Sequence, residues 1–144
     1  MLLAAAHRGE DVADLAEALA GSRLRHHETC ALGEGFAAAV APWERIDAAP
    51  YPIAVGRAAR AIAPDAVLTA YLQATIVNQV QCAQRLMPLG QSDAMGLIAR
   101  LEPVIAETAG RAARSTVDDL GGCAFGAEIA AMRHETLPSR IFRS

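Results

Sequence analysis

Apolar residues recur along this chain at three- and four-residue steps, the spacing of positions on one face of an α-helix. The longest series follows Pro64 and has two adjoining lines: Leu68, Leu72, Ile76, Val80, Ala83 and Met87 in one, and Val67, Tyr71 and Ala74 in the other. Proline is well tolerated in the first turn of a helix, where its missing N–H would have no partner. The pattern therefore predicts that Pro64 begins the longest helix of the chain, and that this helix is central and mostly buried.

Capping and turn residues predict further helices on both sides of this one. The expected helices are residues 11–20, Ser22 to about Ala41, 53–63 after a proline-rich joint, two helices divided by Pro103 between Ser92 and about Val117, and a last helix from Phe125. Gly90 is expected to end the long helix in a left-handed conformation. No alternating strand pattern occurs, so the sequence predicts an all-α, single-domain bundle of about seven helices over residues 1–138.

The composition agrees with closely packed helices and excludes several classes of function. The 144 residues suffice for one domain with a buried core, and 53% of them are apolar although only 4% are aromatic. The net charge of -3 argues against a nucleic-acid binder, which needs a basic face. All 13 basic residues are arginine, which excludes a P-loop lysine and a Schiff base.

The cysteines and the apolar runs bear on where the protein is found. Cys30, Cys82 and Cys123 are odd in number and widely spaced, so they form neither a disulfide framework nor a C-x-x-C motif. Such cysteines are typical of a reducing compartment. No apolar run is long enough to span a membrane, and the first residues lack the basic region of a signal peptide. The sequence predicts a soluble cytoplasmic protein with no membrane partner.

The stretch "RHHETC" is the one candidate for a metal site. His26 and Cys30 are four residues apart, hence on one helical face, and His27 is adjacent to His26. Imidazole and thiolate together suit zinc, nickel or copper. Two or three ligands from one helix leave the coordination shell incomplete, and the alternative is a partly buried cysteine beside solvated histidines. We expect no resident metal or other cofactor, and no nickel site tighter than micromolar.

Other polar residues are candidates for a catalytic pair or for a polar path through the protein. Asp118 and Asp119 could form an acid/base pair, but they stand in a turn before two glycines, and turn chemistry accounts for them. Four polar residues lie inside the long predicted helix: Asn78, Gln79, Gln81 and Gln84. They either satisfy one another or a neighbouring helix, or they line a polar path. Because no catalytic signature is present, we expect no catalytic residues and no enzyme.

Two long stretches, "NQVQCAQRLMPLGQSDAMGLIARLEPVI" (78–105) and "IAAMRHETLPSRIFRS" (129–144), carry motifs that can be matched residue by residue. The first has a helical Asn and an Arg-Leu-x-Pro-Leu-Gly-Gln-x-Asp turn: Asn78, Arg85, Leu86, Pro88, Leu89, Gly90, Gln91 and Asp93. The second has a Met-Arg-His-Glu helix and a Ser-Arg-Ile-Phe-Arg-Ser tail: Met132, Arg133, His134, Glu135, Ser139, Arg140, Ile141, Phe142, Arg143 and Ser144. With looser matches in "SRLRHHETCALGEGF" and "APYPIAVGRAA", nearly the whole chain resembles the UreF family of urease accessory proteins.

The resemblance implies an all-helical, dimeric accessory protein that is not an enzyme. Proteins of this family bind the UreD/UreH-type accessory protein and recruit the GTPase UreG, and the assembly inserts nickel into apo-urease in a GTP-dependent step. Nickel passes through the assembly and is not a cofactor of UreF. The family normally begins with a further segment that is not found in this sequence. Helices that pack on such a segment are expected to expose apolar surface.

The last residues are predicted to form a docking arm, residues 139–144. Pro138 cannot continue the preceding helix, and the residues after it are expected to be extended. Ile141 and Phe142 then serve as apolar anchors for a partner, and Arg140 and Arg143 as forked donors to it. The residues of this chain that are expected to contact the partner are Arg133, His134, Glu135, Ser139, Arg140, Ile141, Phe142 and Arg143. A tail that folds back on its own protein is the alternative. Two other identities stay open: an unrelated all-α interaction module, and a small helical metal-binding protein that uses His26 and Cys30.

Overall fold

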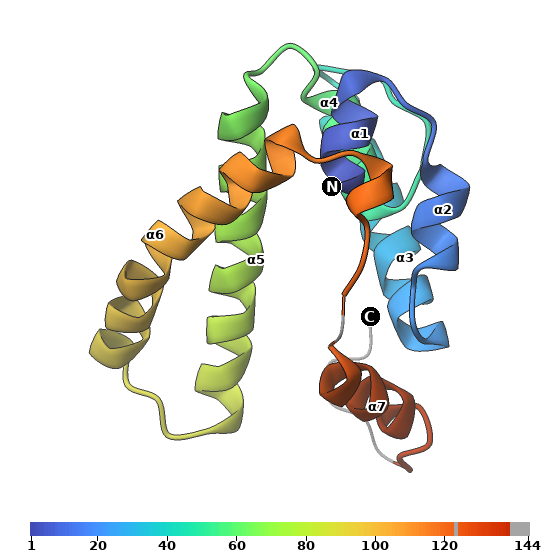
Figure 1. Ribbon diagram of the computed structural model, residues 1–144. Coiled ribbons are helices and arrows are strands. Elements are labelled where there is room, and N and C mark those ends of the chain that lie inside the picture. Colours follow the sequence, from blue (N-terminus) through green and yellow to red (C-terminus); the bar gives the residue numbers. More distant parts are fainter. Residues whose placement is uncertain (123, 139–144) are drawn as a thin grey trace. The chain divides into compact units, whose positions relative to one another are not determined.

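The computed structural model describes residues 1–122 and 124–138, which form seven α-helices, one 3-10 helix and no strand (Figure 1). The predicted all-α class is confirmed. The helices separate into two compact units, one made of residues 1–60 and the described residues from Thr116 onward, the other of Ala61–Ser115. Within the described chain, no helix is long and apolar enough to cross a membrane.

The first unit contains five α-helices and the 3-10 helix. Their bounds are α1 (Leu2–Arg8), α2 (Ala13–Ala18), α3 (Arg23–Val40), α4 (Tyr51–Ala58), the 3-10 helix η1 (Val117–Asp119) and α7 (Phe125–His134). The predicted cap of α3 is confirmed, because the Ser22 hydroxyl accepts a hydrogen bond from the Arg25 N–H at 3.2 Å. The start of α7 at Phe125 is also as predicted.

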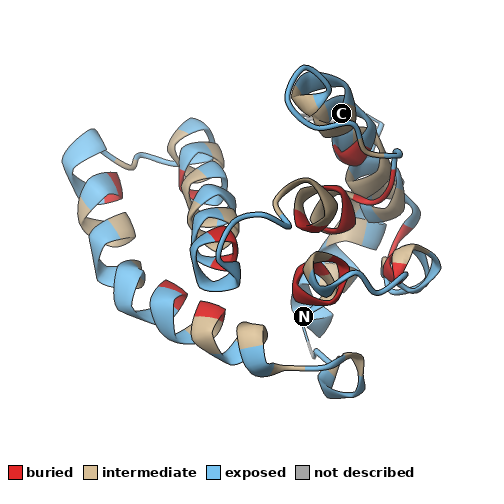
Figure 2. Ribbon diagram, turned by 90° about the horizontal axis from the view of Figure 1, so that it is seen from above, coloured by how far each residue is buried: buried red, intermediate tan, exposed pale blue. Residues whose placement is uncertain are grey.

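The core of the first unit is built largely from small side chains. Ala5, Ala6 and Ile53 are completely buried, and Val12 and Ala16 of the α2 segment pack with them. Figure 2 colours the buried residues of the helices red. Small residues let helices approach closely, so dispersion contacts form between backbone and side-chain atoms along α1 and α4. The alanine-rich sequence of the first helix is therefore explained by its position at the centre of this unit.

Two glycines set the distances at which α4 packs on its neighbours. A Cβ atom on Gly56 of α4 would lie 2.6 Å from the Leu3 carbonyl oxygen of α1. A Cβ atom on Gly33 of α3 would lie 1.8 Å from the Ala49 carbonyl oxygen, just before α4. Since neither separation is possible for carbon and oxygen atoms, these crossings exist only because glycine has no side chain.

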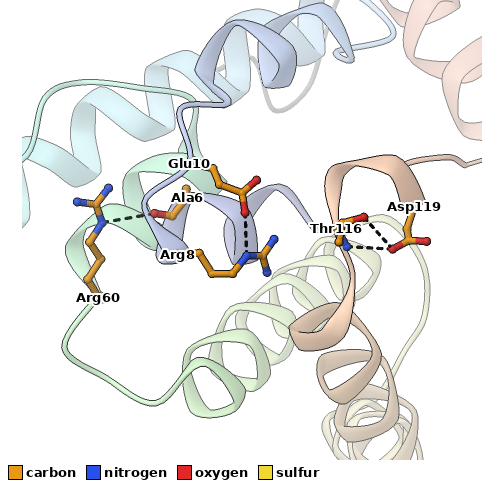
Figure 3. Close-up of polar contacts among 6 residues, drawn as sticks. All are labelled: Ala6, Arg8, Glu10, Arg60, Thr116 and Asp119. Carbon is orange, nitrogen blue, oxygen red and sulfur yellow. Dashed lines mark hydrogen bonds and ion pairs between the residues drawn. The ribbon is translucent and has the colours of Figure 1, made fainter.

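Polar contacts of two arginines close the loops next to α1 and α4. Arg60 Nε donates a hydrogen bond to the Ala6 carbonyl oxygen at 3.4 Å, which ties the end of α4 to α1 (Figure 3). Arg8 Nε pairs with Glu10 Oε1 at 2.8 Å across the end of α1 (Figure 3). Gly9, between Arg8 and Glu10, turns the chain. Its φ of 96° lies in the left-handed region that favours glycine.

The second unit is a hairpin of two long helices, α5 (Pro64–Leu86) and α6 (Gln91–Arg114), which lie side by side (Figure 1). Pro64 begins α5, as predicted. The prediction that α5 is mostly buried is wrong: its buried residues are Val67, Leu68 and Val80, and Met87 beyond its end is 56% exposed. Within its unit α5 packs on α6, and its second apolar line passes from the buried Val67 through the half-buried Tyr71 to the exposed Ala74.

The helix α6 is continuous, and the predicted division at Pro103 is wrong. Pro103 lies inside a helix of 24 residues, which makes α6, not α5, the longest helix of the described chain. Proline removes the hydrogen bond to the Ala99 carbonyl oxygen, but the rest of the ladder continues on both sides. Ile105 and Ala109, just after the proline, are buried, and this packing stabilises the second half of α6.

The predicted left-handed conformation of Gly90 is also wrong. Gly90 has φ -68° and ψ 158° and is the N-cap residue of α6. Helix α5 instead ends at Leu86, and Met87 after it is extended with φ -145°, because a residue before a proline is driven out of the helical region. A Cβ atom on Gly90 would meet Asp93 Oδ2 at 3.5 Å, an ordinary contact, so a side chain at position 90 is not strained.

Alanine substitutions at two glycines of α3 are expected to change stability in opposite directions. Gly33→Ala should lower the free energy of unfolding by about 1–3 kcal/mol, because the new methyl group overlaps the Ala49 carbonyl. Gly35→Ala should raise it by about 0.5–1 kcal/mol, since that position has no atom within 4 Å of a new Cβ and alanine favours the helix. Urea denaturation of both variants tests this, and equal shifts would contradict the close approach.

Candidate functional site

Two carboxylates of the α7 segment hold it on the amino-terminal end of α3. Glu135, directly after α7, accepts a hydrogen bond from the Leu24 backbone N–H at 2.9 Å, and its other oxygen lies 3.9 Å from Arg23 Nε. Glu128 pairs with the Arg25 guanidinium group. The first N–H groups of a helix have no partner within it, and that end of the helix carries partial positive charge. Glu135 therefore satisfies a backbone N–H at the start of α3, and Glu128 pairs with an arginine side chain of the same helix end.

Glu128 also fits against the backbone just before α3. Its Oε2 atom is buried and has no hydrogen-bond partner among the described residues. A Cβ atom on Gly21 would overlap this oxygen, so glycine at position 21 provides the space that Glu128 occupies. The sequence Gly21-Ser22 thus has two effects, because Gly21 admits the α7 carboxylate and Ser22 caps α3.

The side of α7 next to the Glu128 and Glu135 carboxylates is apolar and exposed. Phe125, Ile129 and Met132 are 68%, 46% and 48% exposed, and their spacing of four and three residues places them on one helical face. The α7 helix has no buried residue. Exposed apolar side chains grouped in this way are typical of a surface that binds another molecule. We call Phe125, Ile129 and Met132 the apolar face of α7.

The predicted partner-binding residues fall into three groups. Arg133 is exposed beside the apolar face, and His134 is half-buried. Glu135 contacts α3 and is therefore engaged within the chain. The remaining predicted contacts, Ser139, Arg140, Ile141, Phe142 and Arg143, lie outside the described residues, as does the whole predicted arm. The sequence interpretation missed Glu128, whose contacts with Gly21 and Arg25 are tertiary. It also missed the apolar face, which follows from the spacing of four and three residues after Phe125.

The structure adds a third donor to the predicted metal ligands. Glu17 of α2 lies beside His26 and Cys30 of α3, and their donor atoms are all within 4.8 Å of one another. The His26 Nε2 atom is 3.3 Å from Glu17 Oε2. The pKa of the Cys30 thiol is raised by burial and by the negative charges of Glu17 and Glu34. No local pattern connects Glu17 to the histidine stretch, so sequence spacing alone could not have found it.

Asp119 has a structural partner in η1. Its carboxylate accepts hydrogen bonds from the Thr116 N–H at 2.9 Å and from the Thr116 hydroxyl at 3.3 Å (Figure 3). The Thr116 side chain in turn accepts from the Asp119 backbone N–H, and the reciprocal pair is a capping box. The interpretation of Asp118 and Asp119 as turn residues is therefore confirmed for Asp119.

The polar motif between α5 and α6 is mostly on the surface. Gln84 Nε2 donates a hydrogen bond to Gln91 Oε1 at 3.1 Å, across the turn that joins the helices. The other polar residues of the helix and the residues of the turn motif are exposed: Asn78, Gln79, Gln81, Arg85, Pro88, Gly90 and Asp93. Exposure of Asn78, Gln79 and Gln81 argues against a buried polar path, whereas Gln84 bonds to the neighbouring helix, which is the other alternative.

Comparisons with known proteins identify related sequences. A family model described as UreF matches residues 1–102. The chain is 50% identical over 143 residues to the urease accessory protein UreF of Mesorhizobium japonicum, a match that covers 94% of this chain and 64% of that protein. It is 47% identical over 159 residues to UreF of Rhizobium leguminosarum bv. viciae (100% and 71% covered) and 48% identical over 150 residues to UreF of Brucella ovis (96% and 66%). The chain thus spans about two thirds of the length of these relatives.

Substitutions of Glu135 test how α7 is held. Glu135→Ala is expected to lower the free energy of unfolding by about 1 kcal/mol and to speed amide exchange in α7, because the Leu24 N–H loses its acceptor. Glu135→Gln keeps an acceptor oxygen and should have a smaller effect. Glu107→Ala, at an exposed position of α6, is the control and should leave α7 unchanged. If Glu135→Ala behaves like this control, the carboxylate does not hold α7.

Proposed function

The chain belongs to the UreF family of urease accessory proteins, and from this premise we propose that it is a docking protein for urease maturation. In the proposed role it binds the UreD/UreH-type accessory protein and recruits the GTPase UreG as a cytoplasmic homodimer. The assembly then inserts nickel into apo-urease in a GTP-dependent step. Nickel is the cargo of that assembly, and the chain acts without catalysing a reaction.

The observation that carries this proposal is the apolar face of α7, which stays exposed while the neighbouring carboxylates Glu128 and Glu135 anchor the helix on α3. An interface needs apolar and aromatic side chains that become desolvated on binding, and Phe125 is the most exposed member of this face. Arg133 lies next to the face and adds a forked donor for carboxylate or carbonyl groups of the partner. The carboxylates of Glu128 and Glu135 fix the helix on α3, which reduces the entropy that binding costs.

The proposed docking surface continues from α7 into the predicted arm. The arm adds Ile141 and Phe142 as apolar anchors and Arg140 and Arg143 as donors. Because only residues 135–138 separate the arm from α7, one partner can contact the apolar face and the arm together. Membership of the UreF family also removes the alternative of an unrelated helical module.

A charge placed on the apolar face tests its role in docking. Ile129→Asp is expected to weaken binding of the UreD/UreH-type protein at least tenfold, about 1.4 kcal/mol, since a carboxylate would be buried in the interface. Val104→Asp is the matched control, because Val104 is a β-branched residue 55% exposed on α6. Calorimetric affinities of both variants decide the question. Equal affinities for the two variants would contradict the assignment.

Removal of the predicted arm, residues 139–144, tests the remainder of the surface. Partner binding should be lost while the helix content measured by circular dichroism stays the same, because the arm follows a helix-stopping proline and is too short to support a core. Phe142→Ala alone should cost about 2 kcal/mol or more of binding free energy. Unchanged binding after the deletion would show that α7 acts without the arm.

A further inference from the structure

Three donor groups of different chemistry meet between α2 and α3. His26 and Cys30 lie one helical turn apart on α3, and the carboxylate of Glu17 reaches them from α2. The Glu17 and His26 side chains are 46% and 45% exposed, and Cys30 is half-buried. The group is therefore open to solvent on one side and backed by protein on the other.

We propose that Glu17, His26 and Cys30 bind a divalent transition-metal ion of intermediate softness, such as Zn²⁺ or Ni²⁺, in an open and exchangeable site. The donor set selects this class, because imidazole nitrogen and thiolate sulfur favour such ions, whereas Mg²⁺ and Ca²⁺ bind through oxygen. Three protein ligands leave at least one coordination position for water or for a donor from another molecule. The site can therefore exchange its ion.

The distances fit coordination after small movements of side chains. Metal–ligand bonds of roughly 2.0–2.3 Å place neighbouring donors of a tetrahedral ion about 3.3–3.8 Å apart. The His26 Nε2 to Glu17 Oε2 separation of 3.3 Å lies at the lower end of this range, and the largest separation in the group is within 4.8 Å. The half-exposed side chains have room to close that difference. Because α3 fixes the positions of His26 and Cys30, Glu17 makes most of the adjustment.

The local charge also favours a cation. Glu34 lies one turn beyond Cys30 on α3, and with Glu17 it gives the thiol a negative surrounding. An ion held by Cys30 and His26 would carry its positive charge close to the Glu17 carboxylate. Since the ligands remain partly hydrated, the site is expected to bind in the micromolar range. This agrees with the sequence-based expectation that no tight nickel site exists.

The site does not depend on the proposed docking role. Its residues lie on α2 and the first half of α3, and none belongs to the apolar face of α7 or to the predicted arm. Ile129→Asp is therefore expected to leave metal binding unchanged, so failure of one proposal is distinguishable from failure of the other.

The test is titration of the full chain with Co²⁺ and Ni²⁺, followed through the absorption bands of thiolate-bound metal and by calorimetry. One ion per chain and a thiolate band are expected. Cys30→Ser should abolish the band and weaken binding at least tenfold. Cys82→Ser is the matched control, because Cys82 is a second half-buried free cysteine that is not part of the cluster, and it should keep both signals.

Glu17→Gln provides a second variant at an exposed position, with little risk to the fold. It should keep the thiolate band and weaken binding several-fold, because one of three ligands loses its charge. The proposal is overturned if the parent chain gives no band, if Cys30→Ser retains it, or if Cys82→Ser loses it. It is also overturned if Glu17→Gln binds the ion as tightly as the parent, since the third ligand would then be absent.

Discussion

The close approach of backbones at Gly33 and Gly56 is the constraint on which the first unit depends. At these two positions α4 contacts α3 and α1 at distances that no side chain allows. The same packing brings Phe36 of α3 edge-on to Tyr51 of α4, with ring centroids 5.8 Å apart. Once α3 is fixed in this way, its amino-terminal end has a defined position, and this places both the α7 contact and the proposed metal ligands His26 and Cys30.

The α7 helix is held mainly by polar contacts, which distinguishes it from α1 and α4. It has no buried residue, and its described connections to α3 are made by Glu128 and Glu135. Contacts of this kind orient a helix while leaving its apolar side exposed. A helix with few buried contacts also opens locally at low cost in free energy, which lets it adjust to a partner. Both properties suit the docking role proposed for it.

Features controlled by neighbouring residues could be predicted from the sequence, and features controlled by tertiary contacts could not. Pro64 at the start of α5 and Ser22 at the start of α3 act within one helical turn, and both predictions are confirmed. Pro103 was expected to end a helix, but packing beyond it keeps α6 continuous. Glu17 is brought to His26 only by the fold. The family was predicted from long motifs and is confirmed by related sequences, whereas its predicted arm lies outside the described residues.

Amide hydrogen exchange of the chain, alone and with the UreD/UreH-type protein, tests the central claim most directly. That claim is that α7 is the docking surface, anchored on α3 and separate from the core. The account predicts that the partner slows exchange in α7 while exchange in the buried α1 stays the same. Slower exchange confined to α5 and α6, with α7 unaffected, would contradict it.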